Sequence, residues 1–140
     1  MSPLLTMDAY WMGRDASHPA DLTPEIVRNA AHLLRRVNTL IALMHDVELS
    51  PHPVTGTPIS SGWRPPSVNA SMRNAAPRSR HMSGQAVDLW DPEGEIDAWC
   101  FEHQDLLAEV GLWLEHPSAT KSWAHLQSTP PRSGRRIFYP

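Results

Sequence analysis

The clearest strand signal in this chain lies within HMSGQAVDLW, residues 81–90. The run from Ala86 to Trp90 is apolar except for Asp88, which is typical of a buried strand. The polar residues before it predict a loop, because Gly84 allows a sharp turn or a positive φ. The stretch therefore predicts a loop that carries His81 directly into a strand of the core.

The elements on either side of this strand predict the fold class. A helical period of apolar residues, with Thr23 as N-cap, predicts a long core helix over 23–45. A second helix is expected from Asp91 to Gly111, where the glycine ends it. Shorter strands are expected at 59–63, 112–115 and 123–127. This order predicts an α+β domain with a small, mainly antiparallel sheet packed with helices.

Length and composition exclude several classes of protein. The 140 residues predict a single domain, residues 1–140. A net charge of −3 without a basic block argues against nucleic acid and membrane surfaces as partners. One cysteine, Cys100, excludes an internal disulfide and a cysteine-rich metal site. No run approaches the roughly 20 apolar residues of a membrane helix, so no membrane insertion is expected.

The two ends of the chain give weaker signals. Residues 1–22 are mixed and are expected to form an ordered arm that packs on the domain. The tail from Thr129 onward is rich in proline and basic residues and shows no clear periodicity. Residues 1–12 lack the basic start and long apolar stretch of a signal peptide, so we expect synthesis in the cytoplasm.

Two histidines and an aspartate form a candidate metal site. His81 lies in the predicted loop, Asp88 on the strand after it, and His125 on the last predicted strand. An aspartate inside an apolar strand must be paired or metal-bound. Two imidazoles and one carboxylate suit zinc, and three protein ligands leave a fourth position for water, as in catalytic zinc sites.

The same residues carry a resemblance to a known family. The pattern SxHxxGxAxD at 79–88, followed by WxH at 123–125, resembles the signature of the zinc D-alanyl-D-alanine carboxypeptidase family. That family includes VanY- and VanX-type peptidases and phage endolysins, and shares its fold with the Hedgehog signalling domain. The segment SGWRP at 61–65 is similar to a further motif of the family. The matching region covers residues 60–127, about half of the chain.

The resemblance implies a Hedgehog/DD-peptidase-like fold and one Zn²⁺ per chain, bound by His81, Asp88 and His125. It also implies that Arg64 binds a substrate carboxylate or stabilises the developing oxyanion, since a guanidinium suits either task. Ser79 is expected to bind substrate or to orient its loop. Trp123 is expected in the core, where it can also form a wall of the site.

The general base is where the chain departs from the family pattern. Many relatives have Glu-x-x-His at the last ligand, and here Ser122 stands at the glutamate position. Glu115 ends the strand 112–115, and a hairpin with 123–127 would bring it beside His125. We expect Glu115 to act as base and acid, with His116 as the alternative.

The resemblance implies a zinc peptidase that hydrolyses peptidoglycan stem peptides, in the manner of a D-Ala-D-Ala carboxypeptidase. One alternative is an L-alanyl-D-glutamate endopeptidase of phage endolysin type. Another is a non-catalytic, zinc-bearing module that binds the cell wall or belongs to a virion. The expected partner is a peptidoglycan peptide, the expected state is a monomer, and a holin, a virion or lysis would deliver the protein to the cell wall.

Overall fold

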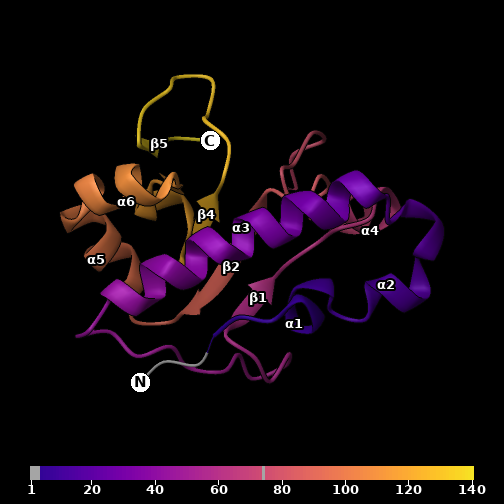
Figure 1. The fold of residues 1–140 in the computed structure, drawn as a ribbon, viewed down its shortest axis with the longest axis horizontal. Helices are drawn as coiled ribbons and strands as arrows, with labels where there is room; N and C mark the ends of the chain where they lie inside the picture. The colour runs from indigo at the N-terminus through magenta and orange to yellow at the C-terminus, as the bar shows by residue number, and fades with distance from the viewer. Residues whose placement is uncertain (1–3, 74) are drawn as a thin grey trace.

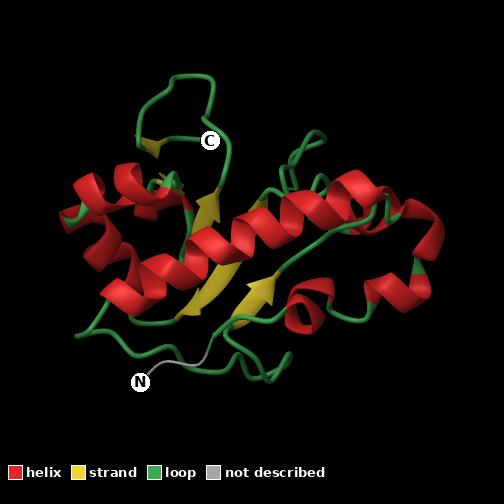
Figure 2. Cartoon of the chain, viewed as in Figure 1, coloured by secondary structure: helices red, strands yellow, loops and turns green. Residues whose placement is uncertain are grey.

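The computed structural model describes residues 4–73 and 75–140 and confirms the α+β class (Figure 2). The described residues contain one five-stranded sheet, in the order β1-β2-β4-β3-β5. The strands are β1 (Ile59–Ser61), β2 (Ala86–Asp91), β3 (Trp113–Glu115), β4 (Ser122–Gln127) and β5 (Ile137–Phe138). The α-helices are α1 (Met7–Trp11), α2 (Arg14–Ser17), α3 (Pro24–Leu43), α4 (Pro66–Ser71), α5 (Glu95–Glu102) and α6 (Gln104–Val110). Two 3₁₀ turns add η1 (Pro19–Asp21) and η2 (Pro117–Ala119).

The sheet is mixed rather than purely antiparallel. β2 and β4 pair in antiparallel fashion at its centre, with β1 and β3 antiparallel on either side. β5 then pairs with β3 in parallel, through bonds such as Leu114 N–H to the Arg136 carbonyl (2.9 Å). The sequence did not predict this strand, because two residues are too few to show a period. Its place depends on β3, which lies more than 20 residues earlier in the chain.

The long helix α3 crosses one face of the sheet and supplies much of the core (Figure 1). It begins as predicted, with the Thr23 hydroxyl accepting from the Ile26 N–H (3.2 Å) and proline in its first turn. Leu33 and Val37 on this helix are fully buried, in the same apolar cluster as Val87 and Leu89 of β2. The opposite side chains of β2 are therefore free to build a site on the other face.

The helix predicted from Asp91 to Gly111 is two helices, α5 and α6, so its continuity was predicted wrongly. The Asp91 carboxylate accepts the N–H groups of Ile96 (2.9 Å) and Asp97 (3.0 Å), which caps α5 several residues later than expected. At His103 the backbone leaves the helical region (φ −124°, ψ 48°), and its imidazole Nδ1 bonds to the Trp99 carbonyl (2.7 Å). Local side-chain bonds thus interrupt the apolar period.

Within the described residues, the N-terminal arm packs on the domain as predicted; residues 1–3 lie outside the described chain. Tyr10 is fully buried, and its hydroxyl donates to the Ala86 carbonyl of β2 (2.8 Å). Its own carbonyl accepts from the Trp63 N–H (3.0 Å). A Cβ on Gly62 would lie 2.0 Å from that carbonyl oxygen, so only glycine fits there. None of the described helices has the length and apolar character of a membrane span.

Candidate metal centre

Three predicted ligands meet on the face of the sheet opposite α3. Asp88 on β2 and His125 on β4 are directly paired in the strand register, so their side chains share a face. His81 reaches the same point from the loop before β2. One ligand atom from each of the three lies within 4.8 Å of the others, and all three residues are buried. Within residues 4–73 and 75–140, this is the one group of three or more potential ligands that could hold a metal ion.

The carboxylate of Asp88 bridges the two histidines. His125 Nδ1 lies 2.9 Å from Asp88 Oδ1, and His81 Nε2 lies 3.3 Å from Asp88 Oδ2. The two imidazole rings have centroids 5.3 Å apart. The donor set predicted from sequence is therefore assembled, with each histidine offering a different ring nitrogen to the same place.

Hydrogen bonds behind His81 select its tautomer. Its Nδ1 lies 2.8 Å from the Gly62 carbonyl oxygen, which can only accept. Nδ1 therefore carries the proton, and the lone pair of neutral His81 is on Nε2, facing Asp88. This is the arrangement that metal-binding histidines use, with one nitrogen bound to a backbone acceptor and the other free for the ion.

The Gln127 side chain fixes the tautomer of His125. The Gln127 Nε2 donates to the Thr129 carbonyl (2.8 Å), which fixes the amide orientation. Gln127 Oε1 then accepts from His125 Nε2 (2.9 Å), so the lone pair of neutral His125 is on Nδ1. Two imidazole lone pairs and one carboxylate thus converge. One proton can bridge only one histidine to Asp88, whereas a metal ion can accept all three donors at once.

The pKa values of Asp88, His81 and His125 are all shifted by burial and by the charges of the other groups in the cluster. Burial by itself raises the pKa of Asp88, but the charges and hydrogen bonds of the two histidines outweigh it and hold that pKa below its usual range. Burial lowers the pKa of His81, and Asp88 only partly offsets it. For His125 burial acts in the same direction, yet the Asp88 hydrogen bond and charge raise its pKa above the usual value. The site therefore keeps an anion at its centre.

Arg64 is fixed at the edge of the cluster. Its Nη2 lies 3.5 Å from Asp88 Oδ2, and its backbone N–H donates to the His81 carbonyl (3.1 Å). Its Nε donates to Ser61 Oγ (3.0 Å) and its Nη1 to Asn69 Oδ1 (3.4 Å). Sequence reasoning singled out Arg64 but missed the supporting roles of Ser61 and Asn69. Their signal was available in SGWRP and in the short helix that follows it, where small polar residues surround an arginine.

Ser79 and Trp123 lie close to the ligands along the chain. The Ser79 hydroxyl accepts the His81 N–H (3.2 Å), which orients the loop, one of its two expected tasks. Trp123 shares a face of β4 with His125 and is paired across the strands with Trp90. Both indoles, expected in the core, are only partly buried and lie outside the main apolar cluster. They flank the metal centre because their strand positions alternate with the core residues.

Of the two candidate bases, Glu115 is the one connected to the cluster. The pairing of Trp113 with Gln127 and of Leu114 with Leu126 places Glu115 level with His125. Burial raises the pKa of Glu115, the charge of His125 lowers it, and that of Asp88 raises it. The His116 imidazole instead bonds through Nδ1 to the Ser118 hydroxyl (2.8 Å) and stacks on Tyr139, with centroids 4.3 Å apart.

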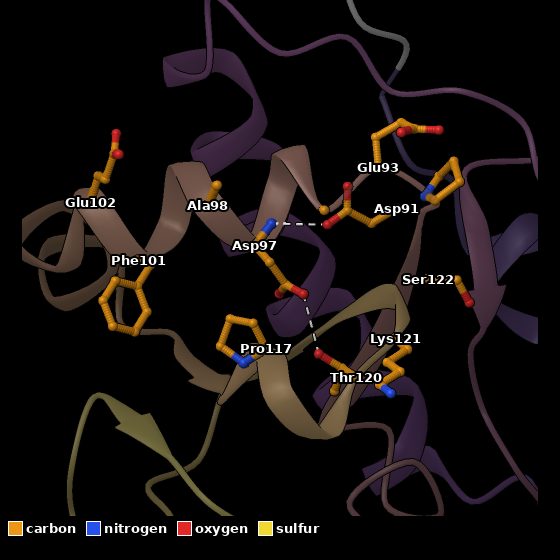
Figure 3. Close-up of a pocket in the computed structure, with 12 residues that line it drawn as sticks. Asp91, Glu93, Asp97, Ala98, Phe101, Glu102, Pro117, Thr120, Lys121 and Ser122 are labelled. Carbon is orange, nitrogen blue, oxygen red and sulfur yellow. Dashed lines mark hydrogen bonds between the residues drawn. The ribbon is translucent and has the colours of Figure 1, made fainter.

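An open cavity of 510 Å³ lies at the other end of β2 and β4, near the start of α5 (Figure 3). Asp91 and Ser122, paired across the strands, line it three residues along from the metal centre. Asp97 of α5 also lines it and accepts a hydrogen bond from the Thr120 hydroxyl (3.2 Å). This end of the sheet is acidic, and among the described residues it holds no cluster of three potential metal ligands.

Comparison of the chain with protein-family models, with curated proteins and with solved structures gave no match. The function proposed below therefore rests on the geometry of the candidate metal centre.

Proposed function

We propose that this chain is a zinc-dependent peptidase that hydrolyses peptidoglycan stem peptides, built on a Hedgehog/DD-peptidase-like fold. The observation that carries the proposal is the convergence of His81 Nε2, His125 Nδ1 and the Asp88 carboxylate within 4.8 Å. Each imidazole has its other nitrogen held by an acceptor, so both lone pairs are directed to one point. Such preorganisation is what a metal site requires and what a chance histidine pair lacks.

The donor set fits zinc better than the harder cations. Mg²⁺ and Ca²⁺ prefer oxygen ligands, whereas two imidazoles and a carboxylate are a common catalytic zinc set. Three protein ligands leave a position for water or substrate. Zinc in this position supplies Lewis-acid polarisation of a carbonyl and an acidified water molecule.

The chain's own residues have separate tasks in this proposal. The Glu115 carboxylate accepts a proton from the attacking water and donates it to the departing amine. Its raised pKa suits this exchange, because a weaker acid holds the proton long enough to return it. The Arg64 guanidinium binds a carboxylate or the developing oxyanion of the substrate, and Trp123 forms one wall.

The substrate class rests on the resemblance of SxHxxGxAxD and SGWRP to the D-alanyl-D-alanine carboxypeptidase motifs. We accordingly propose cleavage at D-Ala-D-Ala or at a neighbouring bond of the stem peptide. Analysis of the released products separates this from cleavage between L-alanine and D-glutamate. Action on the cell wall would require delivery by a holin, a virion or lysis.

The test combines metal analysis of the purified protein with chromatography of digested peptidoglycan, with and without a chelator. We expect about one zinc per chain and release of D-alanine, or of a longer fragment, that the chelator abolishes. Asp88→Ala should lose both zinc and hydrolysis, while Glu93→Ala, a change at an exposed acidic residue, should lose neither. Zinc binding without cleavage would favour the non-catalytic, zinc-bearing module over the peptidase. Absence of bound metal would refute the proposal.

A further inference from the structure

Arg14, at the start of α2, lies against the segment that holds Arg64. Its Nη1 donates to the Trp63 carbonyl at 2.7 Å, so the N-terminal arm contacts the peptide unit that joins Trp63 to Arg64. The two arginines are 50 residues apart in the chain and are both partly buried. Burial first, and the charge of Arg64 second, lower the pKa of Arg14, in keeping with its place beside the Trp63–Arg64 peptide unit.

The charges around this pair are unbalanced. All three ion pairs among the described residues involve the single carboxylate of Asp88, which is shared by Arg64, His81 and His125. None of them involves Arg14. A partly buried cation beside a second cation is unfavourable unless an anion joins them. Asp88 pairs with Arg64 but is shared with the two histidines, and no described ion pair reaches Arg14. The two arginines therefore carry more positive charge than the described chain offsets, and an anionic ligand would balance it.

The donor count leads to the same conclusion. A guanidinium has five N–H donors in a planar fork, and Arg14 uses one of them in its bond to the Trp63 carbonyl. Arg64 directs three of its own to Ser61, Asn69 and Asp88. Donors therefore remain on both groups, and a planar fork matches the two oxygens of a carboxylate.

We propose that Arg14 is the second cation of a carboxylate-binding site, and that Arg14 and Arg64 together hold a free carboxylate of the peptide bound at the metal centre. Its assignment as a substrate site rests on the proposed peptidase function. The substrate class is a peptide with an unblocked carboxylate close to the bond that is cut. The N-terminal arm is then a part of the binding site, in addition to its packing role.

The experiment uses the metal-free protein and two probes that differ in one group, N-acetyl-D-alanine and N-acetyl-D-alaninamide. Calorimetry or NMR titration measures the affinity of each for the wild type, Arg14→Gln, Arg14→Lys and Arg28→Gln. Arg28 is an exposed arginine of α3, so its variant matches the change of charge away from the site. Circular dichroism confirms that each variant is folded, and Arg14→Lys replaces Arg14→Gln if the latter fails to fold.

We expect the wild type to bind the acid and not the amide. Arg14→Gln should weaken binding of the acid by about 10–100-fold, as loss of a charge-assisted bond does. Arg14→Lys should weaken it less, and Arg28→Gln should leave it unchanged. In the loaded enzyme the same Arg14 variants should raise KM for a substrate with a free carboxylate and leave an amidated substrate unaffected.

Three results would overturn the proposal: no binding of the acid to the wild type, equal binding of acid and amide, or unchanged affinity in both Arg14 variants. Binding of inorganic phosphate in place of the acid would also overturn it and would indicate a phosphate site. If the acid binds as expected but the zinc-loaded protein cleaves no peptide, the carboxylate site stands and the peptidase function fails.

Discussion

Two buried carboxylates near the β2–β4 pair have opposite surroundings: Asp88 lies within β2, and Asp97 lies on α5 beside the cavity where the two strands end. Asp88 is 6% exposed and contacts His81, His125 and Arg64, all of them cations or potential cations. Asp97 is 4% exposed, and its charged neighbours are the anions Asp91, Glu115 and Asp88. Burial raises the pKa of both groups, so burial does not explain the difference between them.

The neighbours decide which carboxylate stays ionised. At Asp88 they reverse the effect of burial and leave an anion that can bind a metal ion. At Asp97, burial first and the charge of Asp91 second raise the pKa to about 7. One oxygen of Asp97 also has no hydrogen-bond partner, although Thr120 donates to the other (Figure 3). A buried aspartate is therefore a candidate ligand only when cations or lone-pair donors surround it.

The largest effect is expected from exchanging each aspartate for asparagine. Asp88→Asn removes the only carboxylate among the three candidate ligands and should lower zinc affinity by more than the roughly 10–100-fold that losing a ligand's hydrogen-bond partner costs. Hydrolysis should be lost with it. Asp97→Asn should bind zinc like the wild type. Titration with zinc measures the affinity and stoichiometry of both variants. Stoichiometric zinc in Asp88→Asn would show that the metal does not bind at Asp88.

A second prediction concerns Glu115, whose charge raises the pKa values of both Asp97 and His125. Glu115→Gln should slow hydrolysis by about 10²–10⁴-fold, the usual contribution of general acid–base catalysis, while zinc content stays the same. The control is His116→Gln, which should retain activity because His116 contacts Ser118 and Tyr139 instead. The reverse result, with His116→Gln inactive and Glu115→Gln active, would exchange their roles.

A smaller effect is expected when the support behind a ligand is removed. Gln127→Leu deletes the acceptor that keeps the proton on His125 Nε2. Zinc affinity should fall by about 10–100-fold, and the fold should remain. Gln104→Leu, at an exposed position on α6, serves as the control. Competition with a chelator of known affinity measures the change, and equal affinities for wild type and Gln127→Leu would show that the tautomer does not limit binding.

The smallest effect is expected at Asp97 and depends on pH. In the unfolded chain this carboxyl loses its proton near pH 4, whereas in the folded protein it keeps the proton until about pH 7. Wild-type stability should therefore fall between these values as pH rises. Asp97→Asn removes that loss and should be more stable above pH 7 by about 1–2 kcal/mol, since water from the open cavity screens part of the repulsion. Urea unfolding at pH 4 and pH 8 tests this, and a difference independent of pH would contradict it.

Much of the fold could be predicted from local patterns. The helix over 23–45, the strand at 86–90 and the strand at 123–127 appear close to their predicted bounds, because each has a clear period and recognisable ends. The predictions missed β5, which is too short to show a period, and they failed at the second helix, where single side chains change the backbone. His103 ended one helix and began another, and Asp91 delayed the start of α5 through its carboxylate.

In the candidate site, too, the sequence predicted some features and the tertiary structure decided others. The sequence by itself determined which residues can bind a metal, because an aspartate within an apolar strand requires a partner and two histidines stand at suitable spacing. Only the tertiary structure decided how those residues are held. Gly62 and Gln127 fix the two tautomers, Arg14 reaches Arg64 from the N-terminal arm, and the register of β3 on β4 brings Glu115 level with His125. The Gln127–His125 contact lies within β4 and follows the two-residue period of a strand. The other three contacts join separate elements, and their positions follow from packing and strand register rather than from a local period.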